Sequence, residues 1–131
     1  MIGLDTNVLV RYIAQDDPVQ SPQAVHFIER QCSPDDPGFV GLITLAELVW
    51  VSESCYGATK DGVIDLLRRI LSTKQLLVQD TEVAWQALRL FERGQADFAD
   101  YLVERIARAK GCERTVTFDK TAAKAGMTLL K

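Results

Sequence analysis

The sequence predicts an α/β fold in which a parallel sheet is covered by helices on both faces. Short apolar runs alternate along the chain with longer amphipathic segments, as in successive βαβ units. The chain has 131 residues, of which 47% are hydrophobic and 25% charged. These values are typical of one globular domain, expected over residues 1–131, and argue against disorder or a coiled coil.

Five short apolar runs are expected to form the strands. The first run ends at Asp5, and the last one is expected at an edge of the sheet. The runs are residues 2–4, 39–42, 76–78, 115–118 and 127–130.

The helices are predicted from apolar spacing and from capping residues. Val8, Leu9, Tyr12 and Ile13 share one face of a first helix that ends near Asp16. Serine followed by proline at residues 21 and 22 predicts an N-cap and a first helical position, with a helix to about residue 32. The remaining helical segments are residues 44–57, 59–71, 81–94, 97–110 and a short turn at 120–125.

Acidic residues stand where these elements meet. Ligands of doubly wound sheets bind beyond the carboxyl ends of strands, and Asp5 and Asp119 each follow a predicted strand. Glu47 and Asp100 lie in otherwise apolar helical segments, and Asp97 lies one helical turn before Asp100. Clustered carboxylates repel one another unless a cation neutralises them, and Mg²⁺ prefers oxygen ligands. The pattern favours metal-assisted hydrolysis of phosphodiester bonds.

Each acid also has a purely structural interpretation. Asp5, Asp97 and Asp119 suit helix N-caps, and Asp100 would complement the positive end of its helix. Thr44 and Glu47 have the spacing of a capping box. No acid taken alone shows whether its role is capping or catalysis. Only the joint arrangement of the acids favours a metal site.

Other sites and compartments are poorly supported. The single histidine, His26, lies inside a predicted helix and is expected to be partly buried, and no phosphate-binding glycine loop is present. Three widely spaced cysteines without a C-x-x-C pair suggest reduced thiols in the cytoplasm. Neither a signal peptide nor a membrane span is expected.

The four proposed ligands Asp5, Glu47, Asp100 and Asp119 account for the net negative charge. Without them the formal net charge of −3 becomes +1.

Four segments together resemble the PIN-domain ribonucleases. The string IGLDTNVLV at residues 2–10 is similar to the opening strand and D-T-N signature of that family. TLAEL at 44–48, DFADYL at 97–102 and TFD at 117–119 follow in the matching order. The resemblance covers essentially the whole chain, and its single-domain length resembles the VapC-type toxins of prokaryotic toxin–antitoxin pairs.

The resemblance implies a strand order of 3-2-1-4-5 and a set of site residues. Metal binding and catalysis would fall to Asp5, Glu47, Asp100 and Asp119, with Asp97 as an auxiliary metal-binding acid. Accessory residues that orient the acids or bound water would be Thr6, Asn7 and Thr117. Tyr101 departs from the family, because many relatives have a small residue there, and its ring could narrow the groove.

The expected activity is that of a Mg²⁺- or Mn²⁺-dependent endoribonuclease, the toxin component of a type II, VapBC-like system. The resemblance implies an RNA substrate, a cognate antitoxin and a homodimer, and Arg11 is the basic residue expected to contact RNA or antitoxin. Two alternatives remain at this point. One is a metal-dependent phosphatase or phosphotransfer domain, and the other is a degenerate, non-catalytic binding module.

Overall fold

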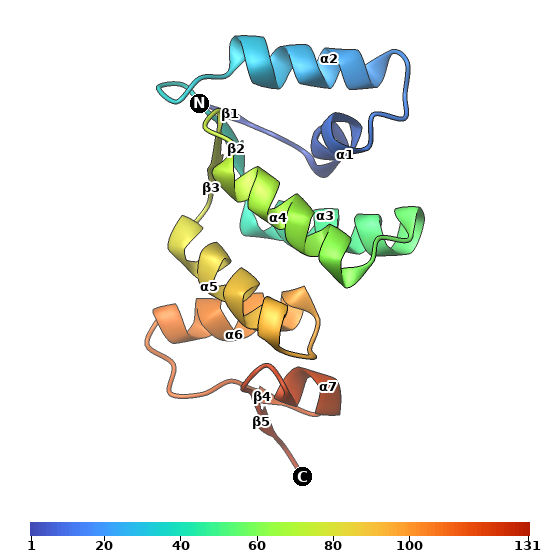
Figure 1. The fold of residues 1–131 in the computed structure, drawn as a ribbon. Helices are drawn as coiled ribbons and strands as arrows, with labels where there is room; N and C mark the ends of the chain where they lie inside the picture. The colour runs from blue at the N-terminus through green and yellow to red at the C-terminus, as the bar shows by residue number, and fades with distance from the viewer. The chain divides into compact units, whose positions relative to one another are not determined.

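The computed structural model describes all 131 residues and divides them into two compact units, Met1–Gln79 and Asp80–Lys131. Figure 1 shows the order of the elements along the chain. The first unit contains β1 (Ile2–Gly3), α1 (Thr6–Ala14), α2 (Gln20–His26), the π-helical turn η1 (Phe27–Gln31), β2 (Gly38–Val40), α3 (Leu42–Tyr56), α4 (Lys60–Ser72) and β3 (Leu76–Val78). The second contains α5 (Thr81–Arg93), α6 (Phe98–Ala109), β4 (Val116–Thr117), α7 (Lys120–Ala123) and β5 (Thr128–Leu129).

The strands of each unit pair in parallel, as the sequence predicts. In the first unit the order is β1-β2-β3, with Ile2 opposite Gly38 and Val40 opposite Val78. In the second unit β4 pairs with β5. The mixed α/β class and the strand order within each unit therefore agree with the expected 3-2-1-4-5 arrangement.

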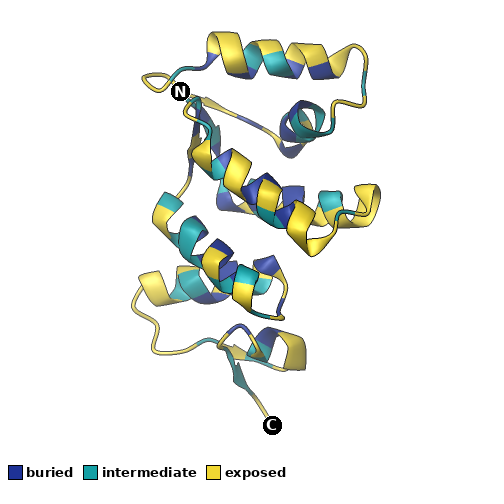
Figure 2. Cartoon of the chain, viewed as in Figure 1, coloured by how far each residue is buried: buried dark blue, intermediate teal, exposed yellow.

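Buried residues lie along one face of the helices and exposed residues along the other (Figure 2), and the buried ones are mainly apolar. In the first unit the fully buried side chains include Leu9, Leu45 and Leu67. In the second unit Phe98 packs edge-on against Phe91, with 5.9 Å between ring centroids. Each such side chain contributes about 1.5–3 kcal/mol when it leaves water, so these stripes hold the helices in place.

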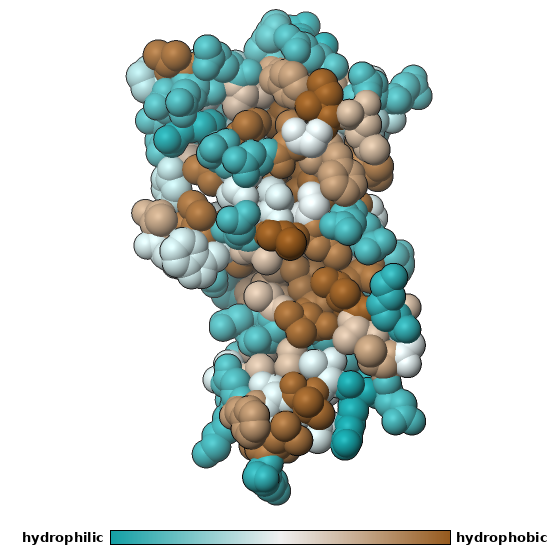
Figure 3. Space-filling view, turned by 180° about the vertical axis from the view of Figure 1, so that it is seen from behind, coloured by the Kyte–Doolittle hydropathy of each residue, from teal (hydrophilic) through white to brown (hydrophobic).

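Apolar side chains also reach the surface of each unit, among the hydrophilic residues that Figure 3 shows from one side. Ile43 and Trp50 of α3 are exposed in the first unit, and Val103 and Phe118 are exposed in the second. None of the helices is both long enough and apolar enough to cross a bilayer.

Two predicted helix starts are wrong. The second helix begins at Gln20 rather than at Pro22, because the Asp17 carboxylate accepts hydrogen bonds from the backbone N–H groups of Val19 and Gln20. The helix predicted from Thr44 begins two residues earlier, at Leu42.

The prediction that His26 is partly buried is also wrong, because its side chain is exposed.

Candidate metal-binding acids

Asp5 and Glu47 are joined through a single threonine. Asp5 is the N-cap of α1, and its Oδ1 accepts a hydrogen bond of 2.8 Å from the backbone N–H of Thr6. The Thr6 hydroxyl donates to Glu47 Oε1 at 3.0 Å. Thr6 is buried, and it connects the N-cap acid of α1, through its backbone N–H, with the acid of α3, through its hydroxyl.

The capping-box interpretation of Glu47 is wrong. Thr44 is the third residue of α3 rather than its cap, since the helix begins at Leu42. The first N–H of α3 is satisfied from elsewhere, because Leu42 N donates to the side-chain oxygen of Gln79 at 3.0 Å. Glu47 is therefore not needed to cap the helix, and its exposed carboxylate contacts Thr6 instead.

Asp97 and Asp100 form a reciprocal capping box at the start of α6. The Asp97 side chain accepts from the backbone N–H of Asp100, and the Asp97 N–H donates to Asp100 Oδ2 at 3.2 Å. Asp97 therefore caps α6, which is the structural role expected for it, and Asp100 takes part in the same cap. The box also fixes two carboxylates side by side in the first turn of one helix.

Asp119 caps the short helix α7. Its Oδ1 accepts from Thr121 N at 2.8 Å, and its own N–H donates to the hydroxyl of Thr117 at 3.0 Å. Thr117 therefore contacts the backbone of Asp119, whereas Thr6 donates to the carboxylates of Asp5 and Glu47. The hydroxyls of both predicted accessory threonines contact the predicted acids or their backbone.

The pKa of the Asp100 carboxyl is raised, mainly because the group is partly buried. Burial raises its pKa above the ordinary value, and the nearby charges of Asp97 and Asp119 raise it further, against the lowering effect of the hydrogen bond from the Asp97 backbone. A bound cation would offset this mixture of desolvation and like charge.

The hydrogen bonds of Asp5, Glu47, Asp100 and Asp119 use only one oxygen of each carboxylate. Asp5 and Asp119 each bond through Oδ1, Asp100 through Oδ2 and Glu47 through Oε1, and none of the four forms an ion pair with lysine or arginine. One oxygen of each therefore remains for a ligand. No group of three or more potential ligands is arranged to hold a metal. The donor set nevertheless fits Mg²⁺, which is usually bound by one or two carboxylates together with water and substrate oxygens.

The structure places these acids in two sets. Asp5 and Glu47 belong to the first unit, whereas Asp97, Asp100 and Asp119 belong to the second. The joint site of both sets stays a prediction from the sequence.

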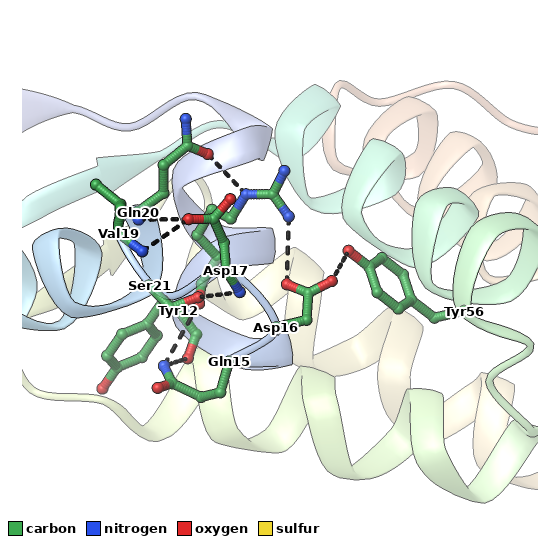
Figure 4. A network of polar contacts seen from close by, with 9 residues as sticks. Tyr12, Gln15, Asp16, Asp17, Val19, Gln20, Ser21 and Tyr56 are labelled. Carbon is green, nitrogen blue, oxygen red and sulfur yellow. Dashed lines mark hydrogen bonds and ion pairs between the residues drawn. The ribbon is translucent and has the colours of Figure 1, made fainter.

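Arg11 is engaged by protein partners. Its Nε donates to Gln20 at 2.8 Å, and its guanidinium lies 3.2 Å from Asp16, whose other oxygen accepts from the Tyr56 hydroxyl at 2.8 Å (Figure 4). The hydrogen bond to Asp16 raises the pKa of Tyr56, as does partial burial. This network connects the end of α1 to the start of α2 and the end of α3.

Arg11 and the accessory residue Asn7 also line a cavity of about 640 Å³ in the first unit. Residues of β1, α1 and α2, together with Phe27, form its wall. Asn7 is exposed.

Tyr101 does not point into a groove as the sequence suggested. Its side chain is buried, its ring meets Phe91 of α5 edge-on, and its hydroxyl approaches the backbone of Ala96. The expected narrowing by this ring is therefore wrong.

Glu104 is a buried acid that the sequence interpretation missed. It is 2% exposed and pairs with Arg105 and with Arg108, the latter at 3.0 Å. Burial alone would raise its pKa, but the two arginines together hold the pKa below its ordinary value. The arginines one and four residues later are the signal that could have revealed this ion-pair cluster.

The sequence pattern of the PIN domain matches residues 2–126. The chain belongs to the PIN-domain family. It is also similar to a VapC ribonuclease of Aquifex aeolicus (strain VF5), with 24% identity over 124 residues that cover 94% of this chain and 90% of that protein. The predicted family is thereby confirmed.

Proposed function

We propose that this PIN domain is a Mg²⁺- or Mn²⁺-dependent endoribonuclease and the toxin of a VapBC-like toxin–antitoxin pair. The observation that carries the proposal is the match over nearly the whole chain to the PIN family and to a VapC ribonuclease, combined with acids that keep an oxygen unpaired. This family match does not favour the phosphatase or phosphotransfer alternative. The protein would act in the cytoplasm, where cysteines such as its three free ones stay reduced.

Asp5, Glu47, Asp100 and Asp119 would hold the ion, with Asp97 as an auxiliary ligand. The ion, when bound, lowers the pKa of its water and polarises a phosphate oxygen. Thr6 restrains Asp5 and Glu47, and Thr117 restrains the backbone of Asp119. Hydrolysis would proceed without a covalent protein intermediate, and Asn7 would orient water or substrate.

The direct test compares Asp5→Asn and Asp100→Asn with the parent in cleavage of end-labelled single-stranded RNA at matched Mn²⁺ concentrations. Each substitution preserves side-chain size but removes a negative charge, so we expect strong loss of cleavage. Asp65→Asn is the matched control, because Asp65 is an exposed acid of α4 outside the proposed site. Equal cleavage by parent and both site variants would refute the proposal. Binding of Mn²⁺ without cleavage would instead favour the non-catalytic module.

The target can be found in cells. RNA ends are sequenced after brief induction of the parent or of Asp5→Asn, and new ends present with the parent alone would mark the cleavage sites. The absence of any such difference would contradict a toxic endoribonuclease.

The proposal includes a cognate antitoxin and a homodimer. Arg11 is proposed to contact RNA or antitoxin from the wall of the cavity, and it must exchange Asp16 or Gln20 for the new partner. Replacing Arg11 by alanine should weaken binding of one of these partners without abolishing Mn²⁺ binding. Sedimentation of the purified chain tests the homodimer.

A further inference from the structure

The hydroxyl of Tyr101 reaches back from α6 to the turn that joins α5 to α6. Tyr101 is 3% exposed, and its ring packs against Phe91 with 6.4 Å between centroids and an interplanar angle of 71°. Because the ring is fixed by this contact, the position of the hydroxyl is also fixed.

Gly94 and Ala96 of this turn both lie close to the Tyr101 hydroxyl. The backbone N–H of buried Ala96 donates to it at 3.4 Å. A Cβ atom on Gly94 would lie 1.7 Å from the Tyr101 oxygen and 2.8 Å from Cζ, so this close approach requires glycine. The hydroxyl therefore occupies the space that any other residue at 94 would fill.

Tyr101 borders the Asp97–Asp100 pair at both ends. It follows Asp100 directly in α6, and its hydroxyl binds Ala96, which directly precedes Asp97. The reciprocal bonds between Asp97 and Asp100 depend on the backbone of this same segment. A shift of Ala96 would consequently move the first carboxylate relative to the second.

We propose that Tyr101 is a positioning residue that holds the Asp97–Asp100 pair in the arrangement that binds the divalent ion. This inference rests on the proposed function, because it assumes that the pair contributes to the metal site. The alternative role of Tyr101 is core packing alone, which its ring would perform without the hydroxyl.

Tyr101→Phe separates these two roles, since it keeps the ring and removes the bond to Ala96. Mn²⁺ is titrated into the full chain, and free Mn²⁺ is measured from its electron paramagnetic resonance signal. We expect the dissociation constant to rise by about tenfold, within the range found when groups that orient metal ligands are removed. Hydrogen exchange at Ala96 and Asp97 should accelerate as well.

Tyr12→Phe is the matched control. Tyr12 is also buried, and its hydroxyl contacts Glu29 at 3.5 Å, away from the acid pair in sequence and within the other unit. This variant should bind Mn²⁺ as the parent does. If Tyr101→Phe fails to fold, Gly94→Ala displaces the hydroxyl by a different route and carries the same expectation.

An unchanged Mn²⁺ dissociation constant in Tyr101→Phe overturns the positioning role and leaves the proposed function intact. An equal rise in Tyr12→Phe also overturns it, because the effect would then follow from any lost phenol. Failure of the parent to bind Mn²⁺ overturns both the proposed function and this inference.

Discussion

Replacing Glu104 by glutamine removes the charge of the one fully buried acid in the second unit while preserving its shape. Breaking a buried ion pair costs about 3–5 kcal/mol. Here the partners are less buried, with Arg105 23% and Arg108 52% exposed, so water rehydrates them when the charge is lost. Glutamine also retains an acceptor. We therefore expect Glu104→Gln to lower the free energy of unfolding by about 1–2 kcal/mol at pH 7.

This cost should depend on pH in one direction. The pKa of Glu104 is lowered in the folded chain, so its stabilising effect is complete above the ordinary glutamate pKa of about 4.3. It is lost as pH falls through the lower pKa of the folded state. The difference between parent and Glu104→Gln should thus be constant from pH 7 to about pH 5 and shrink below about pH 4.

Urea unfolding at pH 7, 5, 4 and 3.5 measures this difference. Trp50→Phe serves as the background for all variants, so that fluorescence reports from Trp85 in the second unit. Glu113→Gln, at an exposed acid of the same unit, is the control and should change little. A Glu104→Gln effect that stays constant with pH, or grows in acid, would refute the reasoning.

Three further substitutions test local features. Gly94→Ala should destabilise the chain by about 1–3 kcal/mol through its clash with the Tyr101 oxygen, and adding Tyr101→Phe should recover part of this loss in a double-mutant unfolding cycle. Thr6→Val removes the hydroxyl that binds Glu47 and should weaken Mn²⁺ binding about tenfold in calorimetry, whereas Thr6→Ser should not. Thr59→Ala removes the side-chain cap of α4 and should lower the free energy of unfolding by about 1 kcal/mol in thermal denaturation, whereas a cost as large in Thr59→Ser would argue against the cap.

Local signals were sufficient where neighbouring residues determine the structure. Thr59 was expected to begin a helix, and its hydroxyl does accept from Gly62 N. The apolar runs likewise predicted the positions of all five strands, although only β2 and β3 contain buried residues.

Distant partners explain what the sequence did not reveal. The start of α3 depends on the side chain of Gln79, 37 residues after Leu42, and no local pattern at Thr44 and Glu47 can show that. Tyr101 similarly finds its place through Phe91 and the absence of a side chain at Gly94. For the acids, the sequence predicted both capping and metal binding, and the structure shows that capping leaves oxygens for the second role.

The helix-capping bonds of the acids have a consequence for how an ion is acquired. Backbone N–H groups at the starts of α1 and α6 already restrain Asp5, Asp97 and Asp100, and the positive helix ends there reduce the repulsion among carboxylates. Within each unit the acids are consequently held in place by the helix starts themselves, whereas the fold of a zinc finger forms only around its metal. Removal of divalent ions by a chelator should therefore stop catalysis without unfolding the chain, and activity should return as soon as ions are restored.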